Sequence, residues 1–128
     1  MTIVLLTLLL LPIPSVNQKV IGTYVMIDRK GLEQHSTLTL KNNYDFIYSY
    51  GVGGCQGEVK GKWSINDNQL LEFKSEIDFN SSSSSNLTPC YPDLNSGHWK
   101  VTKRGLVLQK VMDCACWKVK GLHQKVNK

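Results

Sequence analysis

Residues 46–50 read Phe-Ile-Tyr-Ser-Tyr, and residues 59–65 read Val-Lys-Gly-Lys-Trp-Ser-Ile. In both segments apolar or aromatic side chains alternate with polar ones, a period typical of strands that bury one face and expose the other. The turn sequence Asn-Asp-Asn-Gln follows at residues 66–69, and Leu-Leu-Glu-Phe at residues 70–73 continues the alternation. This part of the chain therefore predicts antiparallel strands joined by tight turns.

Strand character extends along most of the remaining sequence. Residues 98–101 and 106–108 flank Lys-Arg-Gly at 103–105 and predict another hairpin. No segment has a helical period, and the tail after Gly121 is the one candidate for a short helix. Strands are expected near residues 20–27, 36–41, 44–50, 57–65, 69–75, 97–103, 106–112 and 114–120.

Eight short strands with connections of a few residues predict an all-β fold. We expect a single antiparallel meander closed into a barrel, because closure leaves no exposed strand edge. A two-sheet sandwich is the alternative.

The N-terminal segment indicates where the protein resides. Residues 3–16 carry no charge and contain Pro12 and Pro14, and the run is shorter than the roughly 20 apolar residues that a spanning helix needs. We expect residues 1–16 to be a signal peptide and residues 17–128 to form one exported domain that is periplasmic, on the cell surface or secreted. A retained membrane anchor and a buried first strand are the alternatives, and the mature chain is not expected to insert stably into a membrane.

One predicted loop is much longer than the others. Residues 80–97 include a run of five serines and few side chains that could pack. Such a loop serves either as a lid over an open barrel end or as a surface excursion without a role. Asn80 and Asn86 begin N-glycosylation triplets, which have meaning only in a eukaryotic source.

The four cysteines, Cys55, Cys90, Cys114 and Cys116, predict two disulfides in an exported domain. Cys114 and Cys116 lie two apart on a predicted strand, so each is expected to reach a distant partner. Cys90 would then fix the long loop and Cys55 the glycine-rich turn at 51–54, although the pairing stays open. In the alternative, Cys114 and Cys116 supply two thiolates to a Cu(I) or Zn(II) site.

The sequence does not predict an enzyme. It contains no nucleophile elbow, paired carboxylates, phosphate loop or zinc-protease motif. His35, His98 and His123 are expected to be surface side chains, and no cofactor is implied.

Positive charge gathers near the C-terminus. Residues 98–128 carry a net charge of +7, against −2 for residues 1–97. A surface interaction protein that uses this basic face is therefore a further alternative. Nucleic acid is not an expected partner, because few aromatic side chains stand among the lysines.

Several short segments carry a family resemblance. They are Gly22-Thr23-Tyr24, Leu38-Thr39-Leu40, Tyr44-Asp45-Phe46-Ile47-Tyr48, Gly61-Lys62-Trp63-Ser64-Ile65 and Leu70-Leu71-Glu72-Phe73. Over about residues 20–75 this order resembles small exported bacterial lipocalin-like β-barrel proteins, with Tyr24 where lipocalins have Trp and no lipid-attachment cysteine after the apolar run. The resemblance implies a barrel fold with room for a cavity, and nothing further. The function that we expect is that of an exported, non-catalytic binding or scaffold module of lipocalin-like type.

The inward aromatic side chains are the candidate cavity wall. They are Phe46, Tyr48, Tyr50 and Trp63, with Trp63 sharing its face with Val59 and Ile65. They would line a site for a small apolar ligand, or they would fill the barrel as ordinary core. Both interpretations stay open, as does the oligomeric state.

Overall fold

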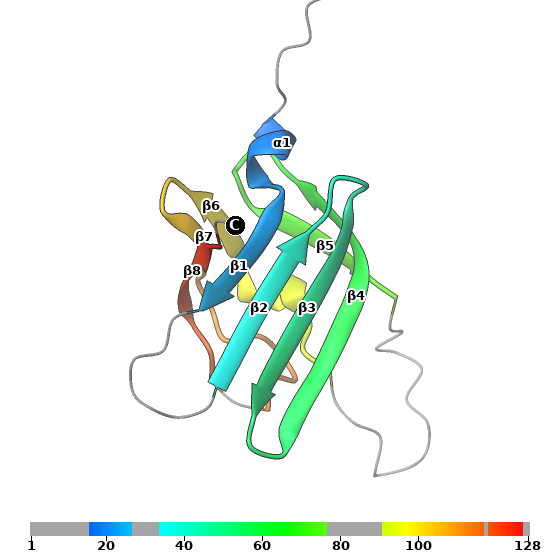
Figure 1. Cartoon of the computed structure of the whole chain (residues 1–128), viewed down its shortest axis with the longest axis vertical. Helices are drawn as coiled ribbons and strands as arrows, with labels where there is room; N and C mark the ends of the chain where they lie inside the picture. Colours follow the sequence, from blue (N-terminus) through cyan, green and yellow to red (C-terminus); the bar gives the residue numbers. More distant parts are fainter. Residues whose placement is uncertain (1–15, 27–33, 77–90, 117, 127–128) are drawn as a thin grey trace, which may run out of the picture.

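One antiparallel sheet of eight strands curves into a nearly closed barrel (Figure 1). It is seen in a computed structural model, which describes residues 16–26, 34–76, 91–116 and 118–126. The elements are α1 (Val16–Val20), β1 (Gly22–Met26), β2 (Gln34–Leu40), β3 (Asp45–Val52), β4 (Cys55–Ile65), β5 (Leu71–Ser75), the 3-10 helix η2 (Leu94–Gly97), β6 (Trp99–Thr102), β7 (Gly105–Leu108) and β8 (Gly121–Lys125).

The strands follow one another as a meander, in the spatial order β5-β4-β3-β2-β1-β8-β7-β6. The barrel closes partly between β5 and β6, where Leu70 and Lys100 form an isolated bridge. Nearby, the Val101 amide donates to the Gln69 carbonyl oxygen at 2.9 Å. The predicted eight-stranded meander barrel is confirmed, and the described strands form one sheet rather than a sandwich.

The strand alternation predicted from sequence builds the core. On β3, Phe46, Tyr48 and Tyr50 are 1%, 0% and 5% exposed, and on β4, Val59 and Trp63 are 0% and 2% exposed. Their neighbours along each strand point outward. Burial of these apolar surfaces supplies the main driving force for folding.

Aromatic rings fill the middle of the barrel. Trp99 on β6 meets the edges of Tyr48 and Phe73, with centroids 5.8 and 6.5 Å apart. Phe73 in turn packs edge-to-face on Phe46 at 4.9 Å. Such edge contacts are the preferred arrangement of aromatic pairs, so β3, β5 and β6 are joined through the centre of the fold.

The two ends of the barrel differ in construction (Figure 1). At one end, termed the helix end, α1 and the β2–β3 turn lie together, and the Tyr24 hydroxyl donates to the Val20 carbonyl at 2.7 Å. The β3–β4 hairpin lies at the opposite end. There Cys55 is bonded to Cys116, with Cα atoms 6.1 Å apart, and this is termed the disulfide end.

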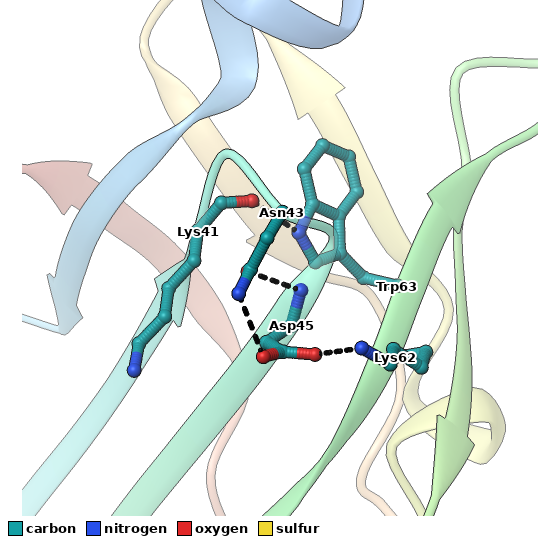
Figure 2. A network of polar contacts seen from close by, with 5 residues as sticks. All are labelled: Lys41, Asn43, Asp45, Lys62 and Trp63. Carbon is teal, nitrogen blue, oxygen red and sulfur yellow. Dashed lines mark hydrogen bonds and ion pairs between the residues drawn. The ribbon is translucent and has the colours of Figure 1, made fainter.

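A polar network holds the β2–β3 turn in place, as Figure 2 shows. The Asn43 side chain bonds both the backbone amide and the carboxylate of Asp45, at 3.0 and 2.9 Å, and Lys62 pairs with the same carboxylate. The hydrogen bond from Lys62 is the main reason why the pKa of Asp45 is lowered. Beside them, the indole N–H of Trp63 donates to the Lys41 carbonyl at 3.0 Å.

The C-terminal third departs from the prediction. The strand expected at 114–120 is wrong, because a bridge and turn occupy residues 113–114 and Cys114 has a positive φ of 66°. The tail after Gly121 is not a helix but strand β8, which pairs with β1 and β7. His123 was expected at the surface, yet it is fully buried. Pairing on both sides of β8 explains the correction, since local sequence does not reveal such distant partners.

The described part of the predicted 80–97 loop packs more tightly than its composition suggested. Leu94 in η2 is fully buried, and the Asn95 side chain bonds the Phe73 amide and carbonyl at 2.8 and 2.7 Å. Residues 1–15 of the predicted signal peptide, and Asn80, Asn86 and Cys90, lie outside the described residues.

Candidate ligand-binding site

A recess of about 660 Å³ opens at the disulfide end. Its walls come from the end of β3, the start of β4, the segment before η2 and the segment after β7. The lining residues are Tyr50, Gly54, Cys55, Gln56, Gly57, Glu58, Tyr91, Cys114, Ala115 and Cys116. Four separate stretches of chain therefore meet around one concave surface.

Tyr50 is the aromatic residue that connects the core to this recess. It pairs in register with Gly57 on β4, and a Cβ added at Gly57 would overlap the hydroxyl end of Tyr50. The missing side chain thus leaves room for the phenol to lie across β4. On its other side Tyr50 stacks on Tyr48, with centroids 5.7 Å apart and planes 20° from parallel.

Burial shapes the chemistry of the Tyr50 hydroxyl. Desolvation raises the pKa of Tyr50, and the neighbouring phenol of Tyr91 adds to the increase. The group therefore stays neutral at physiological pH and can donate one hydrogen bond. Two tyrosines facing one recess offer flat apolar surfaces with polar tips.

The disulfide forms a second wall. It links Cys55, beside the β3–β4 turn, to Cys116, 61 residues later in the chain. The prediction of a distant partner is thereby confirmed for Cys116, and Cys55 does fix the turn. None of the described cysteines, Cys114 included, is a free thiol. The prediction that Cys114 and Cys116 share the face of one strand is wrong, because the chain turns at Cys114.

Charged groups are sparse around the recess. Glu58 is the one carboxylate among the described lining residues, and it is exposed and pairs with Lys60 at 3.2 Å. The Gln56 amide donates to the Gly53 carbonyl at 3.0 Å, which leaves its side-chain oxygen for other partners. No lysine, arginine or histidine appears among the described lining residues. This environment suits an uncharged molecule better than an anion.

The four residues predicted as a cavity wall all belong to the buried core, and none of the described recesses is lined by all of them. Phe46 and Tyr48 are enclosed by other core side chains and line neither this recess nor the one at the helix end. Trp63 lies near the helix end, beside Lys41 (Figure 2), and borders a separate recess of about 240 Å³. Tyr50 alone of the four reaches the site at the disulfide end.

Sequence reasoning missed a polar cluster inside the barrel. Ser36 on β2 bonds both the Tyr48 hydroxyl and His123 Nε2, each at 2.7 Å. His123 Nδ1 lies 3.2 Å from the Gly121 carbonyl oxygen, which can only accept, so Nδ1 carries the proton and Nε2 accepts from Ser36. The Ser36 oxygen then accepts from Tyr48, and the three side chains form one directed chain of hydrogen bonds.

Burial decides what this cluster can do. Ser36, Tyr48 and His123 are each 0% exposed, so a substrate has no access to the serine–histidine pair. Desolvation lowers the pKa of His123 to about 4, against the smaller opposing effect of its bond to Gly121. Desolvation also raises the pKa of Tyr48. The cluster is therefore neutral at physiological pH and acts as a structural element of the core.

The metal alternative finds little support in the oxidised protein. The Cys116 sulfur is bonded to Cys55 and is not available as a thiolate. Within the part of the chain that the structure describes, no three His, Cys, Asp or Glu residues gather as a metal site would require.

Two further findings complete the description. Among the described residues there is no helix with the length and apolar character needed to cross a bilayer. Comparison with protein-family models, with curated proteins and with solved structures gives no match.

Proposed function

We propose that this chain is an exported, non-catalytic binding module of lipocalin-like type that takes a small, uncharged aromatic ligand at the disulfide end of its barrel. The recess lined by Tyr50 and Tyr91 is the observation that carries the proposal. Its volume falls in the range of roughly 300–1,000 Å³ that is usual for small-molecule sites.

The lining supports this class of ligand. Tyr50, Tyr91, Ala115 and the disulfide offer apolar and polarisable surface, on which a flat ring can stack. The tyrosine hydroxyls would fix its orientation through hydrogen bonds. An anion would meet Glu58 and no basic side chain among the described lining residues, which disfavours it.

Export is supported by two independent features. The Cys55–Cys116 disulfide is compatible with an oxidising compartment, and such bonds are rare in the cytosol. The apolar segment at residues 3–16 matches the central region of a signal peptide. Intact mass of the protein isolated from its native compartment, with and without reduction, tests cleavage and disulfide content together.

Ligand binding is tested with N-phenyl-1-naphthylamine, a neutral aromatic dye that fluoresces in apolar sites. Gly57→Ala adds a methyl group that pushes the Tyr50 phenol into the recess, and we expect at least a tenfold loss of dye affinity. Ser64→Ala is the control, since Ser64 is an exposed residue of the same strand that does not line this recess. Absence of saturable binding by the unmodified protein, or equal affinity in the Gly57→Ala protein, would refute the proposal.

A further inference from the structure

A second recess, of about 540 Å³, lies at the helix end. It is bordered by α1, the β4–β5 turn and the β6–β7 hairpin. Val20 and Tyr24, which are 2% and 4% exposed, and the half-buried Val101 form its apolar floor. This recess is on the opposite end of the barrel from the tyrosine-lined site, and its chemistry is different.

Two lysines stand at the rim of the second recess. Lys19 and Lys103 line it, both are exposed, and no carboxylate is among the described lining residues. The described ion pairs involve Lys60 and Lys62, so neither rim lysine has an acidic partner in the described part of the chain. Two like charges beside one apolar floor create a positive potential that an anion would neutralise.

The backbone that carries Lys19 is held by two contacts. The Tyr24 hydroxyl donates to the Val20 carbonyl at 2.7 Å, which ties the end of α1 to β1. The Lys125 ammonium donates to the Lys19 carbonyl at 3.3 Å and brings a third positive charge to this end. Contacts with β1 and β8 therefore hold the backbone that carries Lys19.

Hydrogen bonds within the turn and close packing against β8 hold the β6–β7 hairpin that carries Lys103. The Thr102 hydroxyl donates to the Gly105 carbonyl at 2.9 Å and accepts from the Arg104 amide at 3.2 Å. Gly105 has a φ of +140°, and a Cβ there would overlap the His123 carbonyl oxygen. The β6–β7 turn is thus locked against β8, with Lys103 and Arg104 at its tip.

We propose that the recess at the helix end is a second binding site, which accepts a small amphiphilic anion. Its acidic group, a sulfonate, carboxylate or phosphate, would lie between Lys19 and Lys103. Its apolar part would cover Val20 and Tyr24. Exposed ion pairs alone contribute little in water, so the apolar floor is needed to hold the ligand and the lysines select its charge.

A matched pair of dyes tests this proposal. The probe is 8-anilino-1-naphthalenesulfonate, which is the neutral dye used above with a sulfonate added. We expect the Lys19→Gln/Lys103→Gln protein to bind the sulfonate at least fivefold more weakly at low ionic strength and to bind the neutral dye unchanged. Salt at 0.5 M should weaken sulfonate binding by the unmodified protein to a similar extent as the double substitution does, because salt screens exposed charges.

Location and charge need separate controls. Lys100→Gln removes one positive charge from an exposed position on β6 that does not line the recess, and it should leave sulfonate affinity unchanged. Backbone amide chemical shifts of Thr102 and Gly105 should move on sulfonate binding. Equal affinity in the double variant, an equal loss in Lys100→Gln, or unmoved Thr102 and Gly105 signals would each overturn the proposal. Gly57→Ala should retain this binding, so the two sites can fail independently.

Discussion

Acid should destabilise this protein through one buried side chain, His123. Its imidazole is 0% exposed, and its neighbours Ser36, Tyr48 and Trp99 carry no charge, with the Trp99 ring centroid 4.6 Å away. Protonating Nε2 would place a positive charge in this apolar centre. It would also remove the acceptor to which Ser36 donates. Desolvation is accordingly the main cause of the lowered pKa of His123.

The size of the effect follows from the two pKa values. The pKa of His123 is about 4 in the folded protein, against 6.5 for an ordinary histidine. At 1.36 kcal/mol for each pKa unit, the difference corresponds to about 3 kcal/mol. Above pH 6.5 the imidazole is neutral in both states and has no effect. Between pH 6.5 and 4 the unfolded chain binds the proton first, so the free energy of unfolding falls; below pH 4 the loss stops growing.

Urea unfolding between pH 4 and 7, followed by tryptophan fluorescence, measures this loss. Because carboxylates also titrate, the comparison is with His123→Gln, which keeps a polar side chain in the cluster but cannot titrate. We expect the unmodified protein to lose about 3 kcal/mol more than the His123→Gln protein over this interval. His98→Gln, at an exposed site, should behave like the unmodified protein. Parallel pH profiles for the unmodified and His123→Gln proteins would refute the reasoning.

Three further changes test the packing. Trp63→Ala should lower the free energy of unfolding by about 3–5 kcal/mol in urea titrations, because a buried indole is removed; a melting temperature near normal would instead mean that Trp63 lines a hollow site. Cys116→Ser removes the described disulfide and should cost about 2–5 kcal/mol by the same assay, whereas an unchanged midpoint would contradict a structural role. Gly61→Ala places a Cβ against the backbone carbonyl of Lys74, which cannot rotate away. We therefore expect loss of folding, measured by soluble expression and circular dichroism. A native spectrum would contradict the clash.

The parts of the fold that could be predicted are those where strand alternation is visible over several residues. Segments 46–50 and 59–65 show this alternation of apolar and polar side chains. They lie on neighbouring strands that pair through a short turn. Strand β8, with the sequence Gly-Leu-His-Gln-Lys, does not show this alternation, because its buried residue is the polar His123. Its burial depends on hydroxyls from Ser36 and Tyr48, far away in the sequence, and no local pattern contains that information.

The candidate site was predictable to a smaller extent. Tyr50 is predictable because it shares a strand face with Phe46 and Tyr48. Its partners in the recess are not, since Tyr91 and Ala115 come from segments far from Tyr50 in the sequence. Gly57 could have been a signal, because a glycine opposite a large aromatic residue in a paired strand leaves room for that ring.

The arrangement of side chains along the barrel axis explains why two different recesses can coexist in so small a fold. The centre is filled by Tyr48, Trp99 and Phe73, which separate the helix end from the disulfide end. Under the two proposals, a ligand at either end would therefore meet its own lining and would not compete with the other for interior space. The aromatic core lies between the two ends, and the side chains beyond it differ, with tyrosines lining one recess and lysines the other. Under the two proposals, these lining side chains would determine which charge each recess accepts.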